Sequence, residues 1–110
     1  MVKVTVFYEQ PDDPAAFEKY YNETHVPKYG ATFPNCIRLE ASKAVANPGE
    51  TPPYYRLGDL WFEDMASMQA GLASPQGQIA VADLENFAKG KYKIMVGEVT
   101  VVPLKKTAAV

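Results

Sequence analysis

The order in which strand-like and helix-like segments alternate is the feature of this sequence that most narrows its fold. Residues 2–8, VKVTVFY, place a valine at every second position and end in two aromatic residues. β-Branched and aromatic residues that repeat at period two are typical of a strand. Segments of similar character at residues 36–45, 54–62 and 91–102 predict three more strands.

A helix is predicted between the first two strands. Asp13 followed by Pro14 is typical of a helix start, because an aspartate side chain caps free backbone N–H groups and proline fits the first turn. Aromatic residues then recur at helical spacing from Phe17 onward. Pro27 disfavours the helical conformation of the residue before it, so we expect the helix to end at about Val26.

Further helices are predicted between the third and fourth strands. Asp64 precedes a short helix, and Ser74 with Pro75 repeats the cap-then-proline start of the next one. Gly90 suits the C-terminal cap of that helix. The order strand, helix, strand, strand, helices, strand predicts an α+β ferredoxin-like split βαβ fold, with a four-stranded antiparallel sheet covered by helices on one face.

Both faces of the predicted sheet are apolar. In the third strand Leu57 and Trp61 share one face, and Leu60 and Phe62 share the other. Helices cover only one face of such a sheet, so the second apolar face needs another cover. A second copy of the chain supplies it most simply, and we therefore expect a homodimer that closes sheet against sheet.

Composition bounds the remaining possibilities. The chain has 110 residues, which we interpret as one domain spanning 1–110, and a formal net charge of −2. Both signs of charge are interspersed, which argues against a nucleic-acid partner. No segment approaches the length of a membrane span, and residues 1–13 lack the layout of a signal peptide, so we expect a cytoplasmic protein without a membrane partner.

No cofactor or metal is expected. A single histidine, a single cysteine and scattered carboxylates give no recognised metal-ligand spacing, and glycine-rich nucleotide loops are absent from the sequence. The single cysteine, Cys36, cannot form a disulfide within the chain. A nucleophilic pair of Cys36 and His25 would need the two side chains close in space, and a small buried thiol is the commoner arrangement.

Two blocks of the sequence resemble the EthD family. Residues 12–27, DDPAAFEKYYNETHVP, are similar to that family's helix with a terminal His-x-Pro. Residues 59–90, DLWFEDMASMQAGLASPQGQIAVADLENFAKG, are similar to its segment of a strand, a short helix, Ser-Pro-x-Gly and Asp-x-x-Asn-Phe. With the strands around them, the likeness covers nearly the whole chain.

The resemblance implies a dimeric α/β barrel, in which two ferredoxin-like subunits join their sheets. It also implies a small, mostly apolar pocket in each subunit, between the sheet and the helices. The family is named for a protein tied to ether degradation, namely the oxidative degradation of ethyl tert-butyl ether. Related barrels include cofactor-independent monooxygenases, muconolactone isomerases and polyketide cyclases. Fold kinship alone does not choose among these chemistries.

His25, the only histidine in the chain, is the candidate catalytic residue. It lies four residues after Tyr21 and eight after Phe17, so it should share their helical stripe and face the sheet at a pocket mouth. An imidazole in that position could exchange a proton with a ligand near neutral pH. The alternative is a helix-end histidine bonded to a nearby carbonyl, where the helix dipole favours its charged form.

Aromatic side chains are the candidate substrate-binding residues, although core packing is the commoner role of any one of them. The set consists of Tyr8, Tyr21, Tyr55, Trp61 and Phe87. Buried tyrosine hydroxyls need partners, and a ligand oxygen or His25 could be one. Asp59 lies in an apolar row, where an unpaired carboxylate is costly, so we expect it to pair with Arg38 or Arg56 across the sheet or the dimer; a catalytic role is the alternative.

Three functions follow from these observations. The first is an oxidoreductase of the cofactor-independent monooxygenase kind, or an isomerase or cyclase that transfers a proton, acting on a small apolar or aromatic catabolic or secondary-metabolic compound. The second is a non-catalytic protein that binds such a small-molecule ligand. The third is a structural dimer whose pocket is collapsed core. Stabilisation by a ligand separates the first two from the third, and turnover separates the first from the second.

Overall fold

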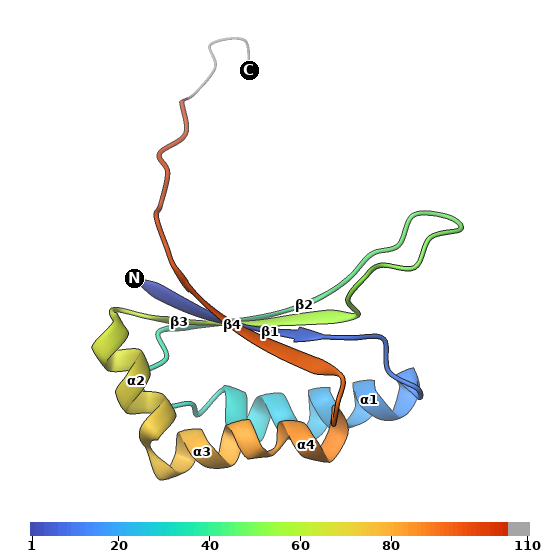
Figure 1. The fold of residues 1–110 in the computed structure, drawn as a ribbon, viewed down its shortest axis with the longest axis horizontal. Helices are drawn as coiled ribbons and strands as arrows, with labels where there is room; N and C mark the ends of the chain where they lie inside the picture. The colour runs from blue at the N-terminus through green and yellow to red at the C-terminus, as the bar shows by residue number, and fades with distance from the viewer. Residues whose placement is uncertain (106–110) are drawn as a thin grey trace.

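The computed structural model describes residues 1–105, and four antiparallel strands form one sheet in the order β2-β3-β1-β4. The strands are β1 (Val2–Tyr8), β2 (Arg38–Lys43), β3 (Arg56–Phe62) and β4 (Tyr92–Glu98). With β1 and β3 in the centre and helical segments on one face, this arrangement confirms the predicted ferredoxin-like fold (Figure 1). β2 and β4 end earlier than predicted, at Lys43 and Glu98.

The helical layer consists of α1 (Pro14–Tyr20), η1 (Tyr21–Gly30), α2 (Met65–Ala73), α3 (Pro75–Ala82) and α4 (Leu84–Phe87). The predicted caps are present: the side chains of Asp13, Asp64 and Ser74 each accept a hydrogen bond from a backbone N–H three residues on. Gly90 adopts φ 72°, which suits a residue without a Cβ and turns the chain from α4 into β4. No helix in residues 1–105 is long and apolar enough to cross a bilayer.

The first helical segment does not end at Val26 as predicted. It continues as the π-helix η1 through Pro27 to Gly30, where the Ala31 N–H donates to the Val26 carbonyl at 2.8 Å. In an ordinary α-helix a proline ring collides with the turn before it. Hydrogen bonds that reach back five residues make a wider turn, and that turn holds Pro27 while the segment stays helical. As a result His25 lies inside a helical segment rather than at its end.

The last predicted helix is divided into α3 and α4 at Asp83. The Asn86 N–H donates to the Asp83 carbonyl, three residues back, whereas the Ala88 N–H donates to Leu84, four residues back. This tighter turn separates the two helices. It also turns the buried Asp83 side chain toward α1 and η1, where it finds its hydrogen-bond partners.

Strand register decides which side chains meet the helices. Val4 of β1 lies opposite Leu60 of β3 and Val96 of β4, and the face that carries Val4 is the one that the helices cover. Two adjoining clusters make the core there. One consists of Val2, Val4, Phe33, Phe62, Met68 and Ala80, and the other of Val6, Tyr8, Phe17, Tyr21, Leu84 and Ala88.

The opposite face of the sheet, which we call the open face, has no helix over it. The β2–β3 hairpin and the segment after β4 project on this side, away from the helices (Figure 1). Here the Thr5 hydroxyl donates to Asp59 at 2.6 Å, and Lys3 Nζ lies 3.8 Å from the same carboxylate. Lys3 also lies over the Trp61 ring, 5.3 Å from its centre. Asp59 therefore takes both partners from the neighbouring strand β1.

The expected pairing of Asp59 with an arginine across the sheet is wrong, whereas a pairing across the dimer stays a prediction. Arg38 is exposed and pairs with Glu40, which follows it on the same face of β2. Arg56 lies on the helix-covered face, opposite Tyr8, and donates two hydrogen bonds to Glu18 of α1. The sheet itself therefore separates Arg56 from Asp59.

Candidate functional site

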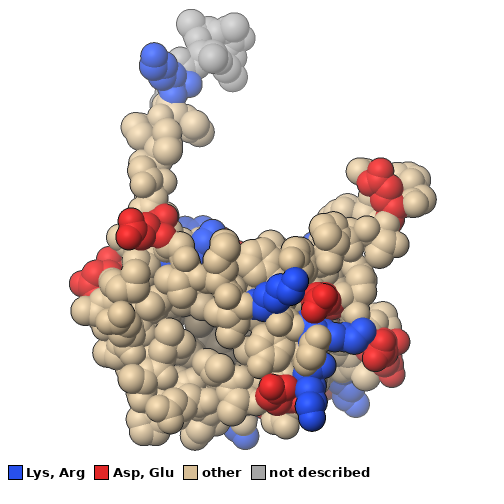
Figure 2. All heavy atoms as spheres, viewed as in Figure 1, with Lys and Arg blue, Asp and Glu red and all other residues tan. Residues whose placement is uncertain are grey.

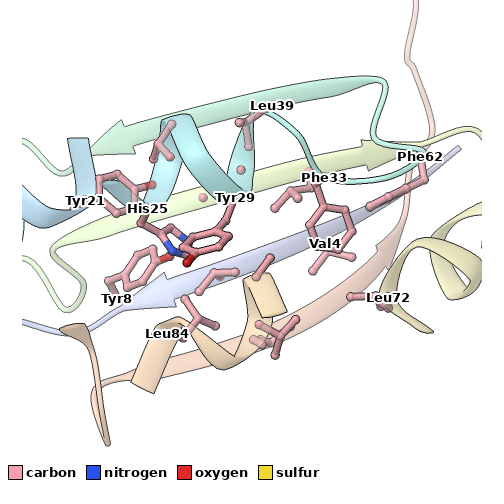
Figure 3. Close-up of a pocket in the computed structure, with 18 residues that line it drawn as sticks. Val4, Tyr8, Tyr21, His25, Tyr29, Phe33, Leu39, Phe62, Leu72 and Leu84 are labelled. Carbon is pink, nitrogen blue, oxygen red and sulfur yellow. The ribbon is translucent and has the colours of Figure 1, made fainter. Parts of the chain in front are cut away.

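A cavity of about 80 Å³ lies between the helix-covered face of the sheet and the helices. The surface is hollowed between these two layers (Figure 2), and the cavity is open to solvent on one side. Its walls are mainly aliphatic and aromatic side chains from β1, β3, β4, η1 and α3. Figure 3 shows His25 at one end of the cavity with Tyr8 and Tyr21, and Phe33 with Phe62 at the other end.

His25 reaches this cavity from η1 and is held there by Asp83. The Nδ1 atom of His25 lies 2.8 Å from Asp83 Oδ2, and the two side chains are 12% and 3% exposed. Tyr21, His25 and Tyr29 recur every four residues along η1, and the three rings lie in sequence along one face, with neighbouring ring centres 6.0 and 6.1 Å apart. Phe87 of α4 also packs against His25, with ring centres 4.7 Å apart.

The Asp83 carboxylate collects hydrogen bonds from three helical segments. Besides His25 of η1, the Tyr20 hydroxyl of α1 donates to Oδ1 at 2.7 Å, and the Asn86 amide of α4 donates to Oδ1 at 2.9 Å. Burial by itself would raise the pKa of Asp83, but these hydrogen bonds, led by that of His25, hold its pKa below the usual value. The bond to Asp83 in turn raises the pKa of Tyr20.

An ionised Asp83 fixes the state of the His25 ring. A carboxylate can only accept hydrogen bonds, so Nδ1 of His25 carries a proton and donates it. The second ring nitrogen, Nε2, has no hydrogen-bond partner within residues 1–105. In a neutral imidazole this nitrogen is the acceptor, which suits it to take a proton from a molecule in the cavity. Asp83 would stabilise the imidazolium that forms.

The predicted site residues separate into three groups. Tyr8, Tyr21 and His25 line the cavity together. Tyr55 and Phe87 pack against Phe17 in the adjacent aromatic cluster without lining the cavity.

Trp61 lies on the open face, because its position in β3 is opposite Lys3 of β1. The structure thus does not bring Trp61 to the cavity. Periodicity placed it correctly in phase with Leu57, but periodicity does not say which face of a strand meets the helices.

Asp83 is the site residue that sequence reasoning missed. A signal was present, since Asp83 interrupts the apolar run of Ala80, Val81 and Leu84, and a carboxylate on a buried helical face needs partners. Its partners, however, are up to 63 residues away along the chain. Within residues 1–105, no three His, Cys, Asp or Glu side chains gather as a metal site requires.

Cys36 does not approach His25. Its thiol packs against the cluster around Phe33 and Phe62, and its Sγ atom lies 3.2 Å from the Arg38 carbonyl. Burial raises the pKa of the thiol, which makes it a weaker nucleophile at neutral pH. The geometry therefore gives no support to a Cys36–His25 pair.

Comparison with known proteins places these features in a family context. Residues 9–91 match the family model described as the EthD domain. An uncharacterized 11.0 kDa protein from the thcB–thcC intergenic region of Rhodococcus erythropolis is 40% identical over 104 residues, which cover 94% of this chain and all of that one. A crystal structure of an ethyl tert-butyl ether d (EthD) family protein from Bacillus halodurans superposes with a TM-score of 0.85 at 28% identity, covering 91% of this chain and 99% of the other.

More distant structures share the fold alone. They include a dimeric ferredoxin-like protein of unknown function from Thermobifida fusca, with a TM-score of 0.65 at 13% identity over 89% of this chain and 90% of that one. They also include SnoaB, a cofactor-independent oxygenase from Streptomyces nogalater, with a TM-score of 0.61 at 15% identity over 92% of this chain and 93% of that one.

Proposed function

Because this chain belongs to the EthD domain family, whose model spans most of its length, we propose that its cavity is the active site of an enzyme that moves a proton on a small, mostly apolar molecule. His25 is the general acid–base in this proposal, and Asp83 is the residue that positions it. The observation that carries the proposal is the 2.8 Å contact of the His25 Nδ1 atom with a buried carboxylate, in a ring that lines the cavity. A histidine that served packing alone would need no buried carboxylate, whose burial is costly.

Removal of a proton from carbon leaves a carbanion, and three outcomes follow from it. The carbanion can be reprotonated at another atom, which is isomerisation, or cyclise onto a second group. It can instead give its electrons to dioxygen, which is the chemistry of a cofactor-independent oxygenase. We favour the oxygenase outcome, in keeping with the ether-degradation context from which the family takes its name. A non-catalytic carrier is the alternative, and turnover separates the two.

A hydrogen-exchange experiment tests the proposal before a product is known. The protein is incubated in D₂O with aromatic acids, lactones, ketones and ethers that carry a weakly acidic C–H, and deuterium uptake is followed by NMR. We expect one class of compound to exchange faster with wild-type protein than with His25→Asn. An oxygen electrode run on the same compounds tells whether dioxygen is consumed. Exchange that never depends on His25, across the whole panel, would refute the proposal.

We propose that the enzyme works as a homodimer whose two open faces meet. This face carries Phe7, Leu57, Trp61 and Met95 around the hydrogen-bonded Asp59 and Thr5. Met95 is 57% exposed in the single chain. Apolar side chains in this position favour cover by a second sheet. The cytoplasmic location expected from the sequence stays a prediction.

A further inference from the structure

Two buried tyrosine hydroxyls end in the cavity without a partner. Tyr8 and Tyr21 are each 2% exposed, yet neither hydroxyl takes part in a hydrogen bond within residues 1–105. In the same part of the chain, no fully enclosed side-chain nitrogen or oxygen lacks a partner. Both hydroxyls must therefore border open space, and the cavity that they line is that space. Buried polar groups are normally paired, so these two call for a polar group on the ligand.

The hydroxyls lie at the same end of the cavity as His25. Gly58 of β3 lies beside both residues: a Cβ atom added there would lie at ordinary contact distance, 3.5 Å from the Tyr21 hydroxyl oxygen and 3.8 Å from the Tyr8 ring. Figure 3 shows Tyr8, Tyr21 and His25 together at this end. The opposite end is closed by Phe33, Phe62, Leu72 and other apolar side chains. A ligand that fits such a cavity has one polar end and an apolar body.

Both hydroxyls are protonated at neutral pH and can donate. Burial raises the pKa of Tyr21 to about 12, and burial raises the pKa of Tyr8 further still. Two O–H donors beside a base make a suitable site for an oxygen that gains negative charge during reaction. A carbonyl oxygen has this property when a proton leaves the carbon next to it, because the charge moves onto the oxygen. The pattern of a base and neutral acidic donors at one end of an apolar site is known from enzymes that form enolates.

We propose that the substrate is a small carbonyl compound whose oxygen accepts hydrogen bonds from Tyr8 and Tyr21 and whose adjacent C–H faces His25. This inference rests on the proposed function. In the step, Nε2 of His25 takes the proton, the C–H electron pair forms a C=C bond to the carbonyl carbon, and the carbonyl π pair moves to oxygen. Return of the proton from His25 to carbon restores the enzyme. The step needs no oxidant or reductant.

A matched pair of probes tests the carbonyl requirement. Cyclopentanone and methylenecyclopentane have the same ring, and only the ketone has an oxygen. Binding is followed by NMR shifts of cavity residues. We expect wild-type protein to bind the ketone about tenfold more tightly than the hydrocarbon, as two modest hydrogen bonds imply. Tyr8→Phe and Tyr21→Phe should each lower ketone affinity severalfold and leave hydrocarbon affinity unchanged, while Tyr55→Phe changes neither.

The possible results separate this inference from the proposed function. Equal affinity of the two probes for wild-type protein, or ketone affinity that ignores both Tyr→Phe changes, overturns the carbonyl assignment. If deuterium exchange at the ketone α-carbon still depends on His25 in that case, the proposed function survives. Exchange that depends on His25 and slows at least tenfold in Tyr8→Phe and Tyr21→Phe supports both. If neither probe binds, the inference is overturned, and so is the assignment of this cavity as the binding site.

Discussion

In the helical layer, between α3 and α4, Asp83 is 3% exposed and accepts hydrogen bonds from three helical segments. On the open face, the Asp59 side chain is 16% exposed and accepts one hydrogen bond, from Thr5, with Lys3 at 3.8 Å. Each carboxylate interrupts an apolar pattern in the sequence, Asp59 between Leu57 and Trp61 and Asp83 between Val81 and Leu84. They differ in where their partners come from, since those of Asp59 belong to the adjacent strand β1. Asp59 therefore joins two strands that the sheet already holds together.

Asp83 instead determines the state of a side chain that reaches the cavity. Its contact with His25 fixes which ring nitrogen is protonated, and the remaining nitrogen is left without a partner in the described part of the chain. A buried carboxylate costs stability unless it is fully hydrogen-bonded, and here α1, η1 and α4 all contribute to that pairing. A structural and a functional acidic group therefore differ less in their burial than in whether the side chain they bind reaches a cavity.

The largest effect is expected from His25→Asn. An asparagine amide can still donate to Asp83, so the fold should persist, but it cannot take up a proton near neutral pH. We expect proton transfer, measured as deuterium exchange into a bound compound, to fall by about 10²-fold or more. Asp59→Asn is the matched control on the open face and should leave exchange near the wild-type rate. Equal losses in the two variants would erase the distinction between the two faces.

A second test asks whether the open face is covered in solution. Met95→Asp places a charge on this face, where a second sheet would bury it, and burial of an unpaired charge is costly. We expect the concentration at which half the dimers dissociate to rise by about 10²-fold or more, as measured by light scattering across a dilution series.

Ile79→Asp provides the control for that test. Ile79 is 55% exposed, close to the 57% of Met95, but it lies on α3 in the helical layer. This change should leave the molar mass in solution unaltered. A wild-type protein that is already monomeric at micromolar concentration, or two variants that dissociate alike, would count against a sheet-to-sheet dimer.

The third test measures how Asp83 contributes to stability. Asp83→Asn should lower the free energy of unfolding at pH 7 by about 2 kcal/mol, since hydrogen bonds to a charged group are worth more than neutral ones. The pKa of Asp83 in the folded protein lies below its ordinary value of 3.8, so its contribution is complete above that pH and is lost as the pH falls through the folded value. The difference between wild type and variant should therefore shrink on acidification from pH 5 to pH 2.

Urea unfolding of both proteins at several pH values checks this expectation. The Glu18–Arg56 pair, which also lowers a carboxylate pKa, is present in both and cancels in the difference. A difference that stays constant down to pH 2 would mean that Asp83 adds nothing through its charge.

Local signals in the sequence were enough to predict most of the fold. Asp13, Asp64 and Ser74 cap the helices as expected, because a cap depends on residues only three positions apart. The course of the chain at Pro27 was not predictable in this way. Whether a proline ends a helix or sits in a wider π-turn depends on what packs against that turn, and the packing of η1 on the sheet and α3 is not local in the sequence.

The site was predictable in part, because helical spacing is a local property of the sequence whereas contacts between distant segments are not. Helical spacing brought Tyr21 and His25 to one face, and the structure keeps them on it. Asp83 contacts His25 across 58 residues of sequence, and local spacing cannot predict a contact between segments so far apart. Trp61 and Tyr8 were grouped because both are aromatic residues in strands, but alternation fixes only relative phase within one strand, and the pairing of β1 with β3 puts them on opposite faces.

The smallest expected effect comes from removing one hydroxyl on each face. Tyr20→Phe deletes the 2.7 Å donor to Asp83, and Thr5→Val deletes the 2.6 Å donor to Asp59. Asp59 keeps Lys3 nearby and has partial access to water, so we expect Thr5→Val to cost no more than about 0.5 kcal/mol. Asp83 is almost fully buried, so solvent replaces the lost donor less readily and Tyr20→Phe should cost about 1–1.5 kcal/mol. Thermal unfolding monitored by circular dichroism resolves this difference, and ¹⁵N shifts of the His25 ring report on its protonated nitrogen in the same samples. We expect Tyr20→Phe to leave the proton on Nδ1, because a carboxylate with fewer donors attracts the His25 proton more strongly. A larger loss in Thr5→Val than in Tyr20→Phe would reverse the ranking of the two carboxylates, and with it the argument that Asp83 is the more tightly held.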